Sequence, residues 1–266
     1  MESFTLTRRD MAHLLLAMEG RSDLQPLAVL QDAWRRTHSH LARSGSTMPT
    51  FLYTEVTPVL DKIIKGKHSA AFSLQEIVSL GQLVEYSHVS LASMQNWVKR
   101  DFKEFLGAPK IGKKYSVNQA AILLIVEDLK SCLDFESIRQ LFHILFQQPE
   151  DDTDDLIQPV DLYAAYSTLF EELDAKGDQL LDVTGAGYAK DNGNSATGQK
   201  RQEAATEELL VQAADQYTCR LEHLTPNQCE AVRNTLLVAA VSVQNSYFLS
   251  MARRYVNATL FLDFQG

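Results

Sequence analysis

Apolar residues recur every three or four positions along most of the chain, which is the spacing that places side chains on one face of an α-helix. The first such run follows Thr7 and Asp10, a pair suited to capping a helix N-terminus, and it stops at Gly20. The same pattern predicts helices over residues 27–36, 59–64, 74–84, 91–100, 122–133, 135–145, 160–173, 203–217 and 226–255. The chain is therefore expected to be nearly all helical.

Two stretches interrupt this pattern. Residues 102–115 contain Gly107, Pro109 and Gly112 among lysines, so we expect an extended hairpin or loop there. Residues 184–202 hold four of the twelve glycines together with asparagine, serine and lysine, a composition typical of a flexible linker. The linker would separate the last two predicted helices from the rest of the chain.

Residues 73–146 show a more specific order of elements: a helix, a tight turn, a short second helix, a basic hairpin and two further helices. This is the order of a winged helix-turn-helix, in which the second helix enters the DNA major groove. The segment contains Val89-Ser90 before the second helix, Trp97-Val98-Lys99-Arg100 within it and Lys110-Ile111-Gly112-Lys113-Lys114-Tyr115 in the hairpin. In these elements it resembles the DNA-binding domain of the MerR family, and more narrowly a poorly characterised group of MerR-like regulators in Gram-positive bacteria.

The resemblance implies an all-α fold class, with a winged helix-turn-helix domain and its small β wing embedded in additional helices. The expected domains are an N-terminal helical segment over 1–70, the winged-helix DNA-binding domain over 71–147, and a C-terminal helical region over 148–266 with a flexible loop at about 184–202. MerR-like domains act as dimers, so we expect a homodimer formed through the flanking helices. On the helix over 226–255 one candidate stripe for this contact, with internal core as the equal alternative, is Leu237, Ala240, Val241, Gln244 and Phe248.

Charge is distributed unevenly. The 266 residues carry a formal net charge of −9, which taken as an average argues against a nucleic-acid partner. Residues 95–115, however, contain six basic and two acidic side chains, and exposed cations are what phosphate binding requires. Short polar side chains on the second helix can approach base edges. The candidate DNA-binding residues are Ser90, Ser93, Gln95, Asn96, Lys99, Arg100, Lys103, Lys110, Lys113, Lys114 and Tyr115.

Two aromatic residues in this segment need separate interpretation. Trp97 is expected in the core, where it would pack the second helix onto the first. For Tyr115 the sequence leaves two alternatives open, packing within the wing and a hydrogen bond to a phosphate.

These observations predict a cytoplasmic DNA-binding transcriptional regulator whose partner is double-stranded DNA. The alternative is a protein–protein interaction module that uses the winged helix without DNA, and an unidentified effector held by the C-terminal helices is a further option. No nucleophile, base and orienting group can be assembled, so we expect no enzyme, no catalytic residues and no cofactor.

The remaining chemistry-bearing residues are assigned no site. Cys132 is expected in the core, and Cys219 and Cys229 are expected to be packed thiols, because their spacing with His223 matches no strong metal pattern. No metal site is therefore expected. No uninterrupted apolar run reaches the roughly 18 residues of a membrane span, so no membrane association is expected.

Overall fold

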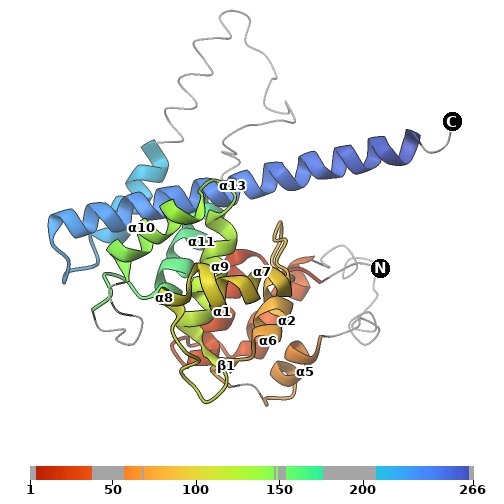
Figure 1. Ribbon diagram of the computed structural model, residues 1–266, viewed down its shortest axis with the longest axis horizontal. Coiled ribbons are helices and arrows are strands. Elements are labelled where there is room, and N and C mark those ends of the chain that lie inside the picture. The colour runs from red at the N-terminus through yellow and green to blue at the C-terminus, as the bar shows by residue number, and fades with distance from the viewer. Residues whose placement is uncertain are drawn as a thin grey trace, which may run out of the picture. The chain divides into compact units, whose positions relative to one another are not determined.

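The computed structural model describes residues 4–37, 57–67, 69–146, 148, 154–175 and 208–263. The expected linker over 184–202 lies outside the described residues, as do residues 203–207 of an expected helix. The chain divides into two compact units, Met1–Ala164 and Ala165–Gly266, which are described separately below. The fold is mostly helical with one small two-stranded sheet, so the predicted all-α class is confirmed at that level (Figure 1).

The first unit consists of short helices gathered around one buried helix. Its two strands, β1 (Ala71–Phe72) and β2 (Tyr115–Ser116), pair antiparallel. Helix α11 (Pro159–Ala175) begins in this unit. The other helices of the unit are α1 (Arg8–Glu19), α2 (Pro26–Thr37), α5 (Pro58–Ile64), α6 (Leu74–Gly81), α7 (Leu91–Asn96), α8 (Lys103–Leu106), α9 (Val117–Leu129) and α10 (Phe135–Leu145), with a π-helical turn, η1 (Trp97–Asp101), directly after α7.

Local capping places several helix starts where the sequence predicts them. The Thr7 hydroxyl accepts a hydrogen bond from the Asp10 amide at 3.1 Å, and the Asp10 carboxylate accepts one from the Thr7 amide. Ser73 and Glu76 form the same reciprocal pair at the start of α6. Asp134 caps α10 through the Ser137 amide at 2.7 Å. Each of these bonds satisfies an amide that has no partner within its own helix.

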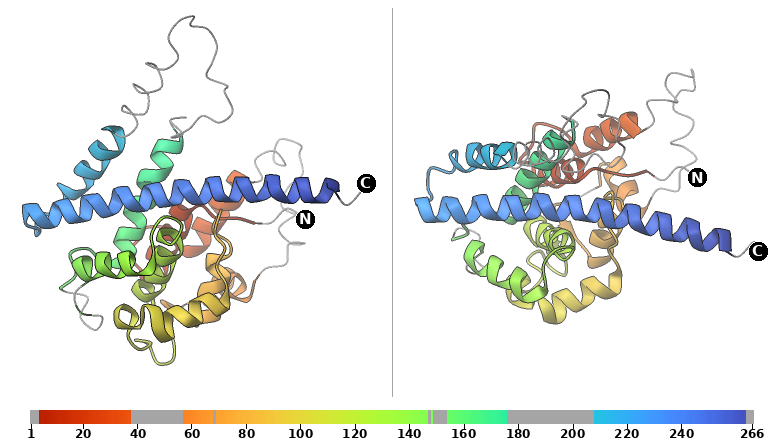
Figure 2. Two further views of the ribbon diagram at one scale, coloured as in Figure 1. Left: turned by 45° about the horizontal axis from the view of Figure 1, so that its top comes forward. Right: turned by 90° about the horizontal axis from the view of Figure 1, so that it is seen from above.

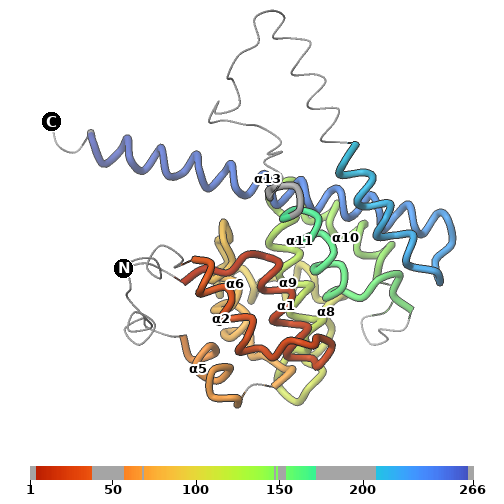
Figure 3. The backbone as a smooth tube through the Cα atoms, turned by 180° about the vertical axis from the view of Figure 1, so that it is seen from behind, coloured from red at the N-terminus to blue at the C-terminus, as the bar shows by residue number. Residues whose placement is uncertain are grey.

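Helix α9 is the centre of the first unit, because every one of its side chains is buried. Helix α1 packs against it, as the view from behind shows (Figure 3). Arg8 of α1, 1% exposed, forms an ion pair with Asp128 of α9 at 2.9 Å and donates to the Glu85 carbonyl at 3.0 Å. The chain before α1 also joins this region, since Leu6 forms a parallel bridge with Val84. The N-terminal helices therefore share one core with residues 71–146.

Three local expectations are wrong. Residues 103–106 are helical rather than extended, because this turn buries Phe105 and Leu106, and the Phe105 ring lies 5.5 Å from that of Phe142 on α10. Cys132 is exposed rather than part of the core, because α9 ends at Leu129 and Cys132 falls in the turn that follows. Cys219, expected to be packed, is exposed as well.

The second unit contains the end of α11, a helix over residues 208–218 and the long helix α13 (Pro226–Asp263). Gln228 caps the start of α13 by accepting from the Thr225 amide at 2.9 Å, as predicted. Asp215 contacts Arg233 at 3.4 Å, which joins the 208–218 helix to the N-terminal part of α13. Figure 2 shows α13 as one unbroken helix, and it ends eight residues beyond the predicted end at residue 255.

Helix α13 is also long and apolar enough to cross a membrane, judged by length and composition alone, and 44% of the relevant window is buried. The sequence shows no uninterrupted apolar run here, because small and polar residues are interspersed among the apolar ones of this window. The core helix of a globular unit gives the same signal.

Candidate nucleic-acid interface

The helix after the α6–α7 turn is held in place by its inner face. The Ser90 hydroxyl caps α7 by accepting from the Ser93 amide at 3.1 Å. Met94, Trp97 and Phe102 are at most 3% exposed, so one side of the segment from α7 to α8 is fully packed. Trp97 is buried as predicted, but its ring meets Phe135 of α10 edge-on at 6.3 Å, with the Lys130 ammonium 5.3 Å from its centre.

The outer face of the same segment is polar and basic. Its exposed side chains are Ala92, Gln95, Asn96, Lys99 and Arg100 on α7 and η1, and Lys103 and Glu104 on α8, after the break at Phe102. Among the described residues, no carboxylate lies within ion-pair distance of Lys99 or Lys103. Two amides, three cations and the Glu104 carboxylate thus face solvent from a segment whose other side is anchored.

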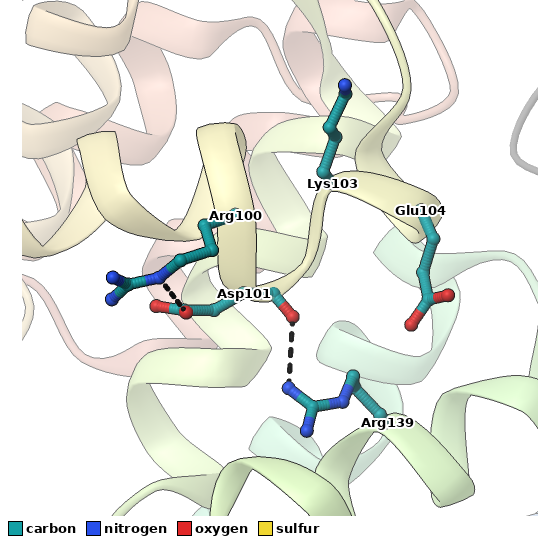
Figure 4. A pocket seen from close by; sticks show the side chains of 5 residues that line it. All are labelled: Arg100, Asp101, Lys103, Glu104 and Arg139. Atoms are coloured by element: carbon teal, nitrogen blue, oxygen red, sulfur yellow. Dashed lines mark hydrogen bonds and ion pairs between the residues drawn. The ribbon is translucent and has the colours of Figure 1, made fainter.

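The end of this segment is held by Arg139 of α10. Arg139 donates to the backbone carbonyl of Asp101 at 3.3 Å and pairs with Glu136 at 2.6 Å, which raises the pKa of its guanidinium. Arg100 pairs with the Asp101 carboxylate at 2.8 Å. In Figure 4, Arg100 and Arg139 approach Asp101 from two sides, whereas Lys103 points away from both. The open cavity of about 480 Å³ that these residues line is therefore not a converging anion site.

The predicted wing is a tight hairpin turn. Ile111 and Lys114 exchange two backbone hydrogen bonds of 3.1 Å, and Gly112 between them has φ 64°, which glycine adopts without strain. Lys110 and Lys113 are exposed, while Lys114 is partly exposed and lies 3.8 Å from Glu76 of α6. The turn therefore presents lysines to solvent, as the sequence predicts.

Tyr115, the last candidate residue of the wing, belongs to the sheet. It pairs with Phe72 across β1 and β2 and is half-buried, and this burial raises the pKa of its phenol. The sheet pairing favours the packing alternative for Tyr115.

Gln119, 2% exposed on α9, fixes the base of the wing. Its side-chain oxygen accepts from the amides of Lys110 at 3.3 Å and Ser116 at 2.9 Å. Its side-chain nitrogen donates to the carbonyls of Leu106 and Ala108, the latter at 2.7 Å. One buried amide thus connects the end of α8, the wing and the start of α9.

The two serines among the candidate residues have a local role. The Ser90 and Ser93 hydroxyls lie 2.8 Å apart and are engaged in the cap of α7. The structure therefore exposes candidates on both the helix and the wing, whereas Ser90, Ser93 and Tyr115 are occupied within the fold. Within the part of the chain that is described, no three histidine, cysteine or acidic side chains gather as metal ligands.

Sequence reasoning missed the positioning roles of Gln119 and Arg139. The Ser116-x-x-Gln119 spacing is a capping-box signal that could have located Gln119, and Glu136-x-x-Arg139 is a recognisable helical ion-pair spacing. Neither spacing reveals the contacts with residues 101–110, since those come from the tertiary fold.

Comparison with known proteins gives two matches. Residues 60–166 match a family described as a domain of unknown function (DUF1836). The whole chain is similar to the uncharacterized protein YkrK of Bacillus subtilis (strain 168), with 31% identity over 254 residues, covering 96% of this chain and 97% of the relative. No solved structure gives a significant match.

The resemblance to the MerR family is wrong, because the matching family is the domain of unknown function and the relative is uncharacterised. The resemblance rested on the short motifs Val89-Ser90, Trp97-Val98-Lys99-Arg100 and Lys110-Ile111-Gly112-Lys113-Lys114-Tyr115 and on the order of elements. In this structure those motifs serve general purposes: Ser90 caps a helix, Trp97 packs in the core and Tyr115 pairs in a strand, roles that many unrelated folds use.

Proposed function

The chain belongs to the same family as YkrK, and we propose that it is a cytoplasmic DNA-binding transcriptional regulator in which residues 71–146 act as a winged helix-turn-helix. In this proposal the segment from α7 to α8 enters the major groove and the lysine-bearing turn follows the neighbouring phosphate backbone. The observation that carries it is the outward-facing polar and basic side of that segment.

The division of the helix into two faces supports this proposal. The inner face is packed through Met94, Trp97 and Phe102, so the helix is rigid and its outer side chains start from a fixed backbone. The outer face offers Gln95 and Asn96, whose amides can form paired hydrogen bonds with adenine. Base recognition needs both a fixed helix and outward polar side chains. A mobile helix would lose conformational entropy on binding, which would weaken the affinity.

The distribution of charge supports a phosphate partner. The exposed cations on the helix and wing are Lys99, Arg100, Lys103, Lys110 and Lys113, with Lys114 partly exposed beside Glu76. Among the residues that the structure describes, Arg100 is the one helix cation of the three with a close carboxylate, that of Asp101. Each cation that neutralises a phosphate releases a condensed counterion, which gives binding a strong salt dependence.

One such surface is small for a specific DNA site, since single modules bury only about 600–1,000 Å² of protein surface. We propose that two copies bind together, as helix-turn-helix proteins do when they read two half-sites about one helical turn apart.

The test compares two double variants of the full chain on a random-sequence duplex. Lys113→Ala/Lys114→Ala removes two wing cations, and it should weaken binding on every sequence and reduce the salt slope by about one unit per lost phosphate contact. The matched control is Lys65→Ala/Lys67→Ala, which removes two exposed cations near the end of α5. The control should behave as the unchanged protein. Equal slopes for the wing variant and the unchanged protein would refute the role of the wing.

A protein partner for the same surface is the competing function. An exposed Ile111 (49%) at the wing turn is the feature that favours it, since an apolar residue there adds nothing to phosphate binding. Absence of a gel shift at low salt, with the chain folded, would favour this alternative.

A further inference from the structure

Helix α13 changes character along its length. In its first half Val232, Leu236, Ala239 and Val243 are at most 1% exposed, so one side of this half is buried. From residue 252 to residue 262 every side chain is exposed. The helix thus continues for three turns beyond its packed part without cover from any described residue.

The exposed side of α13 carries large apolar residues at a regular interval. Val241, Phe248, Tyr255 and Leu262 are spaced by seven residues, which is close to two helical turns, so they lie along one face. Val241 is 47% exposed, and Tyr255 and Leu262 are each 71% exposed. The small residues Ala252 and Thr259 lie between them on the same face, and Leu249 and Val256 flank it. We call these eight residues the α13 stripe.

This stripe differs from the one that the sequence suggested. Ala240 and Gln244 of the suggested stripe are 2% and 9% exposed, so they are buried. Val241 and Phe248 belong to both stripes. The accessible apolar face therefore overlaps the suggested stripe at these two residues and continues toward the C-terminal end of α13.

The exposed end of α13 has little stability as an isolated helix. An isolated helix of about 12 residues is marginal in water, because helical stability in proteins comes mainly from packing of an apolar face. Exposed Tyr255, Val256 and Leu262 provide such a face without a partner among the described residues. A partner that covers the face would stabilise the helix and bury the apolar surface in one step.

We propose that the α13 stripe packs against the α13 stripe of a second copy of this chain. The seven-residue interval is the one with which two equal helices wind around each other, and the small residues between the large ones allow close approach. Covering six large side chains per copy, at about 80 Å² each, buries on the order of 1,000 Å² in total, the lower limit of a stable interface. An isologous contact of this kind closes with two copies.

The positions of the charged residues favour a second copy over a lipid bilayer. Arg253 and Arg254 lie within the exposed end but off the stripe, on the other faces of the helix. In a dimer of two helices these guanidinium groups remain in water. The exposed end from residue 252 to residue 262 spans only about 16 Å, too short to cross a hydrocarbon core of about 30 Å. The apolar window of the helix, which is long enough, is 44% buried inside the protein.

The inference makes the proposed function more specific, since it says where the two DNA-binding copies join. It is tested without DNA, so its failure and that of the proposed function are distinguishable. A dimer that binds no DNA would overturn the proposed function alone, and a monomer that binds DNA at low salt would overturn the dimer alone.

The experiment is sedimentation velocity of the full chain with two variants. Tyr255→Glu/Leu262→Glu places four charges in the seam of each dimer and should raise the dimer dissociation constant about 100-fold or more. The matched control is Phe261→Glu, which changes a residue that is 67% exposed but lies on the opposite side of the helix. The unchanged protein and the control should be dimers at roughly 50 µM, and the stripe variant a monomer.

Circular dichroism confirms that each variant is folded, which is expected because residues 252–262 are all exposed. Three results would overturn the inference: a monomeric unchanged protein, a dimer that survives the stripe variant, or equal loss in the control. Co-sedimentation of the unchanged protein with anionic phospholipid vesicles is the last arm. Vesicle binding that is lost in the stripe variant, with a monomeric unchanged protein, would assign the face to a membrane instead.

Discussion

Replacing the buried Gln119 by alanine tests whether the wing is held by α9. The substitution removes four hydrogen bonds at once, two accepted from the amides of Lys110 and Ser116 and two donated to the carbonyls of Leu106 and Ala108. A net hydrogen bond contributes about 1 kcal/mol, and a buried group left without a partner costs about 1–3 kcal/mol. Because water can reach part of this site, we expect a loss of about 2–4 kcal/mol.

Urea unfolding of the full chain measures this loss, and hydrogen exchange locates it. The Lys110 and Ser116 amides should exchange faster in Gln119→Ala, whereas amides of α1 should change less. The matched control is Gln140→Ala, because Gln140 is exposed on α10 and its side chain donates to Glu136 at 3.3 Å. The control should cost less than about 0.5 kcal/mol. A loss in Gln119→Ala no larger than in the control would refute the reasoning.

Two further substitutions test the core and the start of α6. Arg8→Ala should destabilise the chain by about 3–5 kcal/mol in urea unfolding, because it leaves Asp128 buried without its cation; a loss below about 1 kcal/mol would contradict this. For Glu76, burial raises the pKa of the carboxyl but is outweighed by hydrogen bonds from Lys62 and the Ser73 amide, so the folded pKa is lowered. The contribution of Glu76 to folding stability is therefore present above its pKa in the unfolded chain. It is lost as the pH falls through its pKa in the folded protein. Glu76→Gln should lose this acid-side dependence in unfolding curves measured between about pH 6 and pH 3, and an unchanged pH profile would count against it.

Local interactions explain why much of the fold could be predicted. The starts of α1, α6 and α10 depend on a capping side chain and an amide three residues later, as at Thr7, Ser73 and Asp134. Such contacts are complete within one turn of chain, so the sequence pattern alone contains them. The exposure of the basic residues on the helix and wing can likewise be predicted locally, because polar residues that recur at helical spacing indicate a solvent-facing side.

The remaining features depend on contacts between residues that are distant in sequence. Arg8 and Asp128 are 120 residues apart, and a buried ion pair at this separation leaves no local pattern. The helical turn that contains Phe105 forms because α10 offers Phe142 as a packing partner, which overrides the glycines and proline nearby. In the α6–α7 turn the left-handed residue is Tyr86, with φ 60°, although neither its type nor its neighbours predict that conformation.

The candidate site shows the same division. Lys99, Lys103 and Lys113 are exposed, as the cluster of basic residues in the segment 95–115 predicts. Gln119 and Arg139 act on that surface from α9 and α10, and only the tertiary fold brings them to it. The family resemblance failed for a related reason, since short motifs report local needs such as capping and turn formation rather than ancestry.

Binding of the unchanged full chain to a random-sequence DNA duplex, measured from about 50 to 200 mM salt, is the decisive measurement for the proposed DNA interface. With four to six cations of the helix and wing on phosphates, the affinity should fall by about 10²–10³ across this range, as a straight line in the logarithm of salt concentration. A folded chain that binds no duplex at the lowest salt, or whose affinity is independent of salt, would contradict DNA binding by this surface.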